Sequence, residues 1–400
     1  MSLILVIHHD ADLYGADQSL LRAARALKSS SLTPVVVVPH DGPLVPLLRA
    51  EGLEVHIGPV GKLTRQLLSP AGLPRLIKNL FATIRFLDRA VAGRPVRLVY
   101  INSVAAIGGG LWAKLRRVPR LWHVREIVVA PRLAAAGFPW LLDKLGGWCV
   151  CNSAATRQWL TGQRPALASR SSVLWNGIEP VVSPAPEAVA AFRAKLRFLP
   201  HHTVVTLVGR INRWKGQGVL IQAAALLRAQ GGHADTRFLI VGDVADEQHH
   251  FRETMLQQIQ AAGLQGSVLW HPFTPDVDLV WAASDIAVVP SIEPEPFGRV
   301  AIEAMAHGLP VVAAHHGGLA EIVQAPTTGL LVEPGSAPAL AAAIDQLVRD
   351  PQERQRMGTA GRTRQSQEFT QVQHDRQLMA LIAQQTDTAP RALPAGIIQP

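Results

Sequence analysis

The sequence is poor in cysteine and in charge. Of 400 residues only two are cysteines, Cys149 and Cys151, and they stand in one C-x-C. This spacing is unfavourable for a disulfide, and no second pair is present to complete a zinc site, so we expect two buried thiols in a reducing compartment. Charged residues make up 17% and hydrophobic residues 48% of the chain, which excludes a disordered protein and a coiled coil.

Long apolar runs are also missing. No stretch of about 18 consecutive apolar residues occurs, so the sequence predicts no transmembrane helix. The first residues, MSLILVIHHDADLYG, contain a short apolar run without a basic leader or a cleavage site. This pattern indicates a first β-strand and not a signal peptide, and we therefore expect a cytoplasmic protein.

Positive charge is concentrated in the first half of the chain. The net charge is +9, but residues 1–180 hold 22 Lys/Arg against 10 Asp/Glu, and the remainder holds 17 against 20. The first half is therefore expected to face an anionic partner, either a nucleic acid or an anionic membrane surface. No nucleic-acid-reading module and no interleaving of aromatic and basic residues is recognisable, so we expect no nucleic-acid partner.

Short apolar runs alternate with helical patterns along the chain. Continuous runs suit strands that are covered on both faces, and alternation with helices predicts βαβ units and parallel sheets. The predicted strands are 3–7, 34–39, 96–102, 204–209, 237–242, 267–273, 285–291 and 309–314. The predicted fold class is α/β, with two doubly wound, Rossmann-like domains whose strand carboxyl ends face a common central cleft.

The domain boundaries follow from a proline-rich stretch at 176–192, the best linker candidate. We expect an N-terminal domain over 1–180 and a C-terminal domain over 181–365. The helical segment of about 366–385 is expected to pack back on the first domain, and the tail of 386–400 is expected to be disordered.

A loop of the second domain has the composition of a phosphate site. The segment GRINRWKG, from Gly209 to Gly216, leaves a predicted strand and enters a predicted helix. Arg210 and Lys215 place two cations beside a helix N-terminus, which suits a diphosphate bound without a metal. A solvated basic loop is the alternative.

The segment EPEPFGRVAIEAMAHGLPVVA contains two glutamates eight residues apart, Glu295 and Glu303. Phe297 and Gly298 are expected to begin a helix whose free N–H groups face a ligand. Glu303 would then lie about 9 Å along the helix axis at 1.5 Å per residue. Since an unpaired buried carboxylate is costly, Glu303 either has a structural ion-pair partner or receives a ligand, and the two glutamates could hold hydroxyls at both ends of a nucleotide sugar.

Together these segments resemble the retaining glycosyltransferases of family 4, which have the GT-B fold. The specific parts are the E-x7-E segment and the Gly-Arg…Lys-Gly loop. Further segments match along the chain: YGADQSLL (14–21), LWHVRE (121–126), WNGIE (175–179), GGLAEIV (317–323), TGLLVEPG (328–335), ALAAAI (339–344) and MGTAGRTR (357–364).

The resemblance implies a role for individual residues. Arg210 and Lys215 would neutralise the donor diphosphate, Glu303 would hold the ribose hydroxyls, and Glu295 would hold the sugar hydroxyls. His123 would lie near the reacting sugar, with a packed structural histidine as the alternative. Catalytic roles are expected for Glu295, His123, Arg210 and Lys215. The expected donor-binding residues are Gly15, Ala16, Gly209, Arg210, Lys215, Phe273, Thr274, Glu295, Phe297, Gly298, Arg299 and Glu303.

The implied activity is transfer of a sugar, with retention of configuration, from a UDP- or GDP-linked donor to a lipid-linked glycan or lipopolysaccharide. In this family the leaving phosphate is thought to take the acceptor proton, so we expect no protein nucleophile, no metal and no cofactor. Asp276-x-Asp278 is expected to cap a helix. The histidine pairs lack the i, i+4 spacing of metal ligands; they are His8-His9, His201-His202, His249-His250 and His315-His316.

Two basic segments of the first half point to a membrane. In 73–91 apolar residues recur at helical spacing among basic ones, and 114–132 adds six more cations. The first segment is either an interfacial amphipathic helix or a core helix with a solvated face. We favour a peripheral protein on the inner face of the cytoplasmic membrane. The alternatives are a non-catalytic GT-B subunit that binds a glycan or a partner glycosyltransferase, or another enzyme with two Rossmann-like domains, such as a sugar epimerase or a soluble-glucan synthase.

Overall fold

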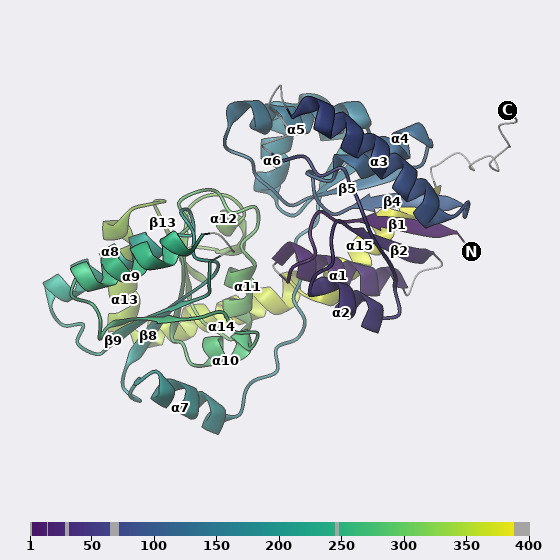
Figure 1. Cartoon of the computed structure of the whole chain (residues 1–400). Coiled ribbons are helices and arrows are strands. Elements are labelled where there is room, and N and C mark those ends of the chain that lie inside the picture. Colours follow the sequence, from purple (N-terminus) through teal and green to yellow (C-terminus); the bar gives the residue numbers. More distant parts are fainter. Residues whose placement is uncertain (1, 14, 29–31, 65–71, 245–247, 388–400) are drawn as a thin grey trace, which may run out of the picture. The chain divides into compact units, whose positions relative to one another are not determined.

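The chain forms two compact units in a computed structural model that describes residues 2–13, 15–28, 32–64, 72–244 and 248–387 (Figure 1). Unit 1 comprises Met1–Asn176 and Val372–Pro400, and unit 2 comprises Gly177–Gln371. The chain thus passes between units at 176/177 and 371/372, where the sequence had suggested 180/181 and 365/366. The predicted tail lies, from residue 388 on, outside the described residues.

Unit 1 is built on a seven-stranded parallel sheet with the order β3-β2-β1-β4-β5-β6-β7. Its strands are β1 (Leu3–Ile7), β2 (Thr33–Val38), β3 (Glu54–Ile57), β4 (Val96–Ile101), β5 (Arg120–Val124), β6 (Trp148–Cys151) and β7 (Ser171–Val173). Its helices are α1 (Gly15–Lys28), α2 (Leu44–Ala50), α3 (Leu73–Val91), α4 (Ile107–Leu115), α5 (Arg132–Leu145), α6 (Ala154–Gln163) and α15 (Gln371–Asp387), with a 3-10 turn η2 (Pro165–Arg170).

Both faces of this sheet are buried, which explains the continuous apolar runs. Leu5 and Ile7 of β1 enter a core shared with α3 and α4, whereas Ile4 and Val6 enter a second core on the other face. That second core includes residues of α1, α2 and the C-terminal helix α15. Since successive residues of a strand point to opposite faces, a doubly covered strand must be apolar throughout.

Unit 2 repeats the plan with six parallel strands in the order β10-β9-β8-β11-β12-β13. The strands are β8 (Thr203–Val208), β9 (Thr236–Val241), β10 (Val268–His271), β11 (Ile286–Val289), β12 (Val311–Ala314) and β13 (Gly329–Val332). The helices are α7 (Pro186–Lys195), α8 (Gln217–Gln230), α9 (His249–Ala261), α10 (Val277–Ala282), α11 (Arg299–Ala306), α12 (Leu319–Ile322), α13 (Ala337–Arg349) and α14 (Pro351–Glu368). The prediction of two Rossmann-like parallel-sheet domains is confirmed, and the cleft between them stays a prediction.

Several details of the sequence prediction need correction. All eight predicted strands are present, but five further strands were missed, namely β3, β5, β6, β7 and β13. β7 has only three residues, too few for a distinct apolar run, and β3 and β5 carry charged residues. The second half of the proposed linker is helical, because α7 begins at Pro186, a position that proline favours.

The two cysteines lie on the buried strand β6, with Val150 between them. Both are free thiols without access to solvent, as predicted. Burial raises the pKa of the Cys149 thiol to about 12 and that of Cys151 further, so both remain protonated at neutral pH. Within the described part of the chain, no helix combines the length and the apolarity needed to cross a bilayer.

An ion pair fastens the edge strand β3 to the end of α3, and it leads to a testable prediction. Both guanidinium nitrogens Nη1 and Nη2 of Arg94 lie 2.7 Å from the Glu54 carboxylate, and Nη2 also donates to the Ala90 carbonyl. The Arg94 hydrogen bonds lower the pKa of Glu54 from its ordinary 4.5 to about 2. A lowered folded-state pKa stabilises the fold above the unfolded pKa, and this stabilisation is lost as the pH falls through the folded value.

We therefore expect Arg94→Ala to lower the midpoint of urea unfolding at pH 7. The difference between the midpoints of the variant and the wild type should become smaller as the pH falls from about 4.5 to about 2. Because about a third of each side chain is exposed, the effect should be modest. Arg25→Ala, which removes an exposed ion pair with Glu51, is the control. A deficit that is constant over this pH range would mean that Arg94 acts only by packing.

Candidate functional site

The loop between β8 and α8 has a fixed conformation that brings Lys215 forward. The side-chain Oδ1 of Asn212 accepts hydrogen bonds from the backbone N–H of Trp214, at 3.1 Å, and of Lys215, at 3.0 Å. Gly216 follows with φ +84°, and a Cβ there would lie 2.0 Å from the Pro290 carbonyl oxygen. Only glycine can close this turn, so the G in the Lys-Gly pair is a packing requirement.

Lys215 meets Glu295, which comes from the loop after β11. The Lys215 Nζ lies 2.6 Å from Glu295 Oε1, and the Ser291 hydroxyl donates to the same oxygen at 2.7 Å. The Glu295 side chain is 5% exposed and that of Lys215 18%. The structure therefore brings together two predicted catalytic residues that are 80 positions apart. Trp214 lies beneath the ammonium, with Nζ 4.5 Å from its ring centre.

A pair of glycines holds the backbone of Glu295. The Gly318 N–H donates to the Glu295 carbonyl at 2.8 Å. Gly317 has φ +59°, and a Cβ there would lie 2.3 Å from the same carbonyl oxygen. The GGLAEIV segment therefore supports the glutamate loop by close backbone approach, a contact that no side chain at Gly317 would permit.

Helix α11 begins at Arg299, not at Phe297–Gly298 as predicted. Gly298 has φ +102°, which is incompatible with a helical residue, and the Phe297 ring is buried against Phe369. Glu303 is consequently the fifth residue of the helix, only about 6 Å along its axis.

Glu303 has an ion-pair partner one turn earlier on α11. Arg299 Nη2 lies 3.1 Å from Glu303 Oε1, and the two side chains are 14% and 19% exposed. Of the two alternatives that the sequence left open, the ion pair is thus present. A partly exposed pair of this kind keeps carboxylate lone pairs for a ligand, so a ribose-binding role for Glu303 stays a prediction. Glu303 thus pairs with Arg299, whereas Glu295 pairs with Lys215.

The remaining predicted residues of unit 2 follow strand ends at the same edge of the sheet. Arg210 comes after β8, and its carbonyl accepts a hydrogen bond from Gln217 Nε2 at 3.0 Å; Gly209 precedes it. Phe273 and Thr274 come after β10, and the Phe273 side chain is 60% exposed. Since carboxyl ends of parallel strands share one edge, these residues lie on the edge that also presents the loops of Lys215 and Glu295.

Asp276 caps helix α10, as predicted. Its Oδ1 accepts a hydrogen bond from the Leu279 N–H at 3.2 Å, and its own N–H donates to the Thr274 hydroxyl. This role accounts for the Asp-x-Asp pattern without a metal.

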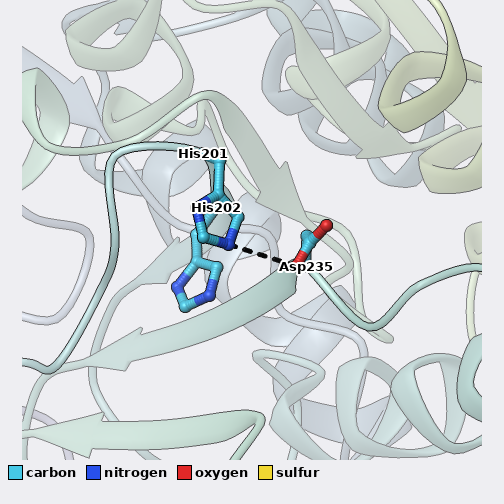
Figure 2. A group of neighbouring side chains, drawn as sticks. All are labelled: His201, His202 and Asp235. Carbon is cyan, nitrogen blue, oxygen red and sulfur yellow. Dashed lines mark ion pairs between the residues drawn. The ribbon is translucent and has the colours of Figure 1, made fainter.

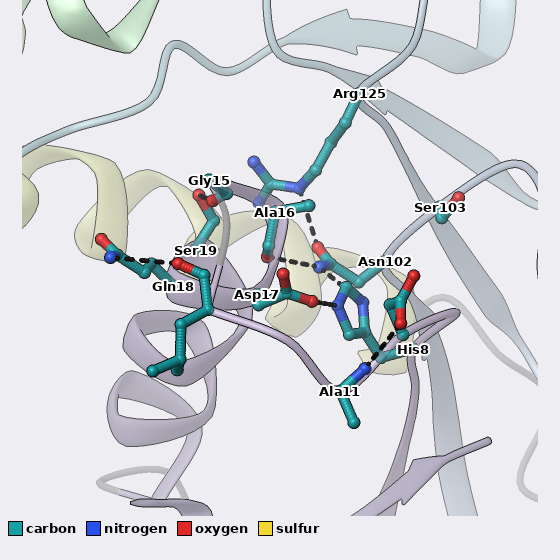
Figure 3. Close-up of polar contacts among 12 residues, drawn as sticks. His8, Ala11, Gly15, Ala16, Asp17, Gln18, Ser19, Asn102, Ser103 and Arg125 are labelled. Carbon is teal, nitrogen blue, oxygen red and sulfur yellow. Dashed lines mark hydrogen bonds and ion pairs between the residues drawn. The ribbon is translucent and has the colours of Figure 1, made fainter. Parts of the chain in front are cut away.

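In unit 1 Gly15 and Ala16, two predicted donor-binding residues, are the first residues of helix α1. The Ser19 hydroxyl donates to the Gly15 carbonyl at 2.8 Å, and Asn102 Nδ2 donates to the Ala16 carbonyl at 3.3 Å (Figure 3). Asn102 was not predicted as a site residue. It stands directly after β4, and a polar residue at the end of an apolar strand is the signal that identifies it.

His123 lies on β5 and is completely buried. Its Nδ1 is 2.6 Å from the Tyr100 hydroxyl and 3.1 Å from Arg125 Nη2. Burial and the Arg125 charge hold the pKa of His123 well below its ordinary value, so the ring is neutral at physiological pH. The contacts that the structure shows for His123 are packing contacts within unit 1. Its contact with a sugar therefore stays a prediction.

Among the described residues, one group of three possible metal ligands contains a histidine pair, and it lies in unit 2. His201, His202 and Asp235 offer atoms within 4.8 Å of one another, and His201 forms an ion pair with Asp235 (Figure 2). Both His202 nitrogens already have partners, since Nδ1 accepts from the Leu199 N–H and Nε2 lies 3.0 Å from an Arg237 nitrogen. A metal ion bound by His202 would therefore have to displace the Arg237 guanidinium, so these three residues are poorly suited to a metal.

Known proteins resemble this chain in sequence. A family model described as "Glycosyl transferases group 1" matches residues 189–364. A D-inositol 3-phosphate glycosyltransferase of Arthrobacter sp. (strain FB24) is 38% identical over 347 residues, which are 83% of this chain and 78% of that protein. Its counterpart from Rhodococcus jostii (strain RHA1) is 42% identical over 165 residues, 40% of this chain. That match and those to two further relatives, from Rhodococcus opacus (strain B4) and Nocardia farcinica (strain IFM 10152), span only 36–38% of the relatives' length.

Solved structures share the fold over nearly the whole chain. Anabaena Alr3699/HepE in complex with UDP has a TM-score of 0.81 at 25% identity, with 96% of this chain and 100% of that chain covered. WaaG, a glycosyltransferase involved in lipopolysaccharide biosynthesis, has a TM-score of 0.70 at 15% identity, with 96% and 100% covered. The predicted GT-B fold is thereby confirmed. The extended match to the Arthrobacter relative and the family model together show that the chain belongs to the glycosyl transferases group 1 family.

Proposed function

We propose that this protein is a retaining glycosyltransferase that moves a sugar from a nucleoside diphosphate to an acceptor hydroxyl. The single observation that carries the proposal is the buried contact between Lys215 and Glu295 at the carboxyl edge of the unit 2 sheet. It places a cation and a hydroxyl-binding carboxylate 2.6 Å apart. UDP is the favoured nucleotide, because HepE has been solved with UDP and with UDP-glucose, and GDP is the alternative.

The chemistry follows from where charge develops. As the bond from the sugar to the diphosphate breaks, negative charge grows on the leaving phosphate, and a fixed cation lowers the barrier. An ammonium has three N–H donors, so the bond to Glu295 leaves Lys215 able to bond phosphate oxygens. Arg210, from the same loop, supplies the second positive charge. Glu295 would orient sugar hydroxyls, and Glu303 the ribose.

The acceptor proton needs no protein base in this scheme. The leaving phosphate takes it on the face of the sugar where the acceptor attacks, so configuration is retained without a protein nucleophile. The proposal accordingly includes neither a metal nor a cofactor. Nucleophile, leaving group and proton are all supplied by the two substrates.

The acceptor is proposed to be a lipid-linked glycan or a lipopolysaccharide. A phosphorylated cyclitol is a second candidate, because the curated relatives are named D-inositol 3-phosphate glycosyltransferases. Turnover of a membrane-bound glycan needs vesicles, whereas turnover of a soluble polyol phosphate does not. Turnover with inositol 3-phosphate in the absence of lipid would favour the second candidate.

The test is a donor panel with the purified full chain. UDP- and GDP-linked hexoses are incubated with and without acceptor extract, and released nucleoside diphosphate is measured. We expect release from at least one donor, with the sugar retained in the same anomeric configuration in the product. If no donor is turned over and no nucleotide binds, the alternative of a non-catalytic GT-B subunit is favoured.

A membrane surface on unit 1 would hold the protein near a lipid-linked acceptor at the inner face of the cytoplasmic membrane. On α3 the side chains of Leu73, Ile77 and Phe81 are 53%, 48% and 66% exposed, and their spacing of four aligns them in one stripe. Exposed basic residues flank it: Arg75, Lys78, Arg85 and Arg89. An apolar stripe beside cations is the arrangement of an interfacial helix, and a core helix would not expose the stripe.

We expect the double substitution Ile77→Glu/Phe81→Glu to reduce binding to anionic vesicles at least about tenfold, because two apolar side chains no longer enter the bilayer surface. Co-sedimentation with vesicles of anionic or neutral lipid measures this. Val182→Glu, at an apolar residue of unit 2 that is 79% exposed, is the matched control. Equal pelleting of the wild type with both lipids would remove the electrostatic part of the proposal.

A further inference from the structure

A chain of buried polar side chains runs across the carboxyl edge of the unit 1 sheet. His8 follows β1, Asn102 follows β4, and His123 and Arg125 lie at the end of β5. His8, Asn102 and His123 are completely buried, and Arg125 is 8% exposed. Figure 3 shows how His8, Asn102 and Arg125 lie. His123 was expected from the sequence to be catalytic, whereas no role has been assigned to Arg125.

Arg125 donates hydrogen bonds in three directions. Its Nε lies 2.8 Å from Asn102 Oδ1, its Nη1 2.7 Å from Asn176 Oδ1, and its Nη2 3.1 Å from His123 Nδ1. A guanidinium has donors only and cannot be deprotonated in a protein. Each partner atom must therefore be an acceptor, so His123 Nδ1 carries no proton. In the neutral ring the proton is then on Nε2.

The Tyr100 hydroxyl makes this assignment depend on Arg125. It lies 2.6 Å from His123 Nδ1 and 3.3 Å from Asn102 Oδ1. Without the guanidinium a second proton arrangement is possible, in which His123 Nδ1–H donates to the tyrosine oxygen and the tyrosine donates to Asn102. With the guanidinium present, Nδ1–H would point at another N–H. Arg125 therefore selects one of two proton arrangements.

The same donor orders the protons further along the chain. Because Asn102 Oδ1 accepts from Arg125, its Nδ2 must face away, where it donates to His8 Nδ1 at 3.2 Å and to the Ala16 carbonyl at 3.3 Å. His8 then carries its proton on Nε2, which donates to Asp17 Oδ1 at 2.8 Å. The Gly15–Ala16 segment is thus attached to Arg125 through a single asparagine (Figure 3).

The surroundings keep His123 uncharged. The charged or titratable groups that face it are Arg125, the Tyr100 hydroxyl and His374, whose ring stacks on it at 6.3 Å between centres. Asp375 lies behind His374, at 3.1 Å from its Nδ1. Burial and the Arg125 charge lower the pKa of His123. Among the residues that the structure describes, none bonds to His123 Nε2.

We propose that Arg125 is a positioning residue that fixes His123 as the tautomer protonated on Nε2 and so makes it a hydrogen-bond donor, not a general base. Through Asn102 it also holds the Gly15–Ala16 segment. The consequence for catalysis rests on the proposed function, whereas the tautomer itself does not.

The tautomer is measured directly by nitrogen NMR of the full chain labelled with ¹⁵N-histidine, with the His123 signals assigned by His123→Gln. We expect the wild-type ring to be neutral and protonated on Nε2 throughout pH 5.5 to 8. In Arg125→Met we expect a substantial population protonated on Nδ1 and a higher pKa. Tyr100→Phe is the matched control, because it keeps the guanidinium and should keep the wild-type tautomer.

Kinetics then separates positioning from packing. We expect Arg125→Met to lower kcat about 10- to 100-fold, the effect of one lost hydrogen bond to a charged group, with a smaller change in donor KM and a new loss of activity at low pH. A wild-type ring that is charged or protonated on Nδ1 at pH 7 would overturn the proposal, and so would an unchanged tautomer in Arg125→Met. If that variant does not fold, the wild-type and Tyr100→Phe spectra decide alone. The expected spectra without turnover of any donor would overturn the proposed function only.

Discussion

Replacement of Lys215 by methionine is expected to lower kcat/KM for sugar transfer by about 100- to 1,000-fold, the usual effect of removing one group that stabilises transition-state charge. Methionine keeps the apolar stem of the side chain over Trp214 and removes the ammonium. The loss should fall mainly on kcat, because charge on the leaving phosphate is greatest in the transition state. Initial rates over a range of donor concentrations separate the two parameters.

The substitution also leaves a buried carboxylate without its cation. Breaking one side of a buried ion pair costs about 3–5 kcal/mol of stability. The stability of Lys215→Met must therefore be measured together with its activity, to separate a folding defect from a catalytic one. In Lys215→Met/Glu295→Gln the uncompensated charge is gone, and we expect stability to return while activity stays low. Recovery of activity together with stability would mean that Lys215 serves the fold and not the chemistry.

The neighbouring Arg213 provides a matched control on the same loop. Its side chain is 70% exposed and pairs with Glu293, and exposed pairs contribute only about 0–1 kcal/mol. We expect Arg213→Ala to leave both kcat and the free energy of unfolding close to wild type. A loss of activity as large as that of Lys215→Met would indicate a general requirement for positive charge on the loop.

Removal of the Glu303 carboxylate is expected to weaken nucleotide binding about 10- to 100-fold, since a hydrogen bond to a charged group contributes about 1.5–3 kcal/mol. Glu303→Ala should raise the dissociation constant for UDP and for UDP-sugar alike, because the proposed contact is with the ribose. Isothermal calorimetry with UDP measures the effect without any acceptor.

Arg299→Ala distinguishes a ligand role from a structural one for Glu303. If the role of Glu303 were only structural, its 3.1 Å ion pair with Arg299 on α11 would explain the carboxylate completely. In that case the two single substitutions should cost similar stability and leave UDP affinity unchanged. If Glu303 binds ribose, Glu303→Ala should lose far more affinity than Arg299→Ala, at a similar melting temperature.

The sequence was sufficient for the architecture because burial of both sheet faces produces a pattern visible in each strand. Runs such as LILVI and PVVVVP could be recognised as doubly covered strands without any knowledge of their partners. Short strands such as β7 could not, because three residues at a sheet edge have no periodicity of their own. Their conformation is set by pairing with a neighbour.

The sequence predicted which types of residue form the site, but not which of these residues pair with one another. The cations and carboxylates of two loops could be identified, but the sequence did not indicate that Lys215 bonds to Glu295. The i, i+4 spacing of Arg299 and Glu303 was visible in the sequence, and their pair was left as one of two alternatives. The Lys215–Glu295 pair depends on a tertiary contact between residues 80 positions apart, whereas the Arg299–Glu303 pair lies within about one helical turn. The start of α11 was misplaced because Gly298 adopts a positive φ and a Cβ there would meet Leu319, neither of which local sequence reveals.

Calorimetric titration of UDP, GDP and ADP into the wild type and Lys215→Met tests the central claim most directly. The account predicts saturable binding of one diphosphate to the wild type with one-to-one stoichiometry, weakened at least about tenfold in the variant by the loss of one charge-assisted phosphate contact. Binding of equal strength to both proteins, at matched stability, would contradict a phosphate site built on Lys215.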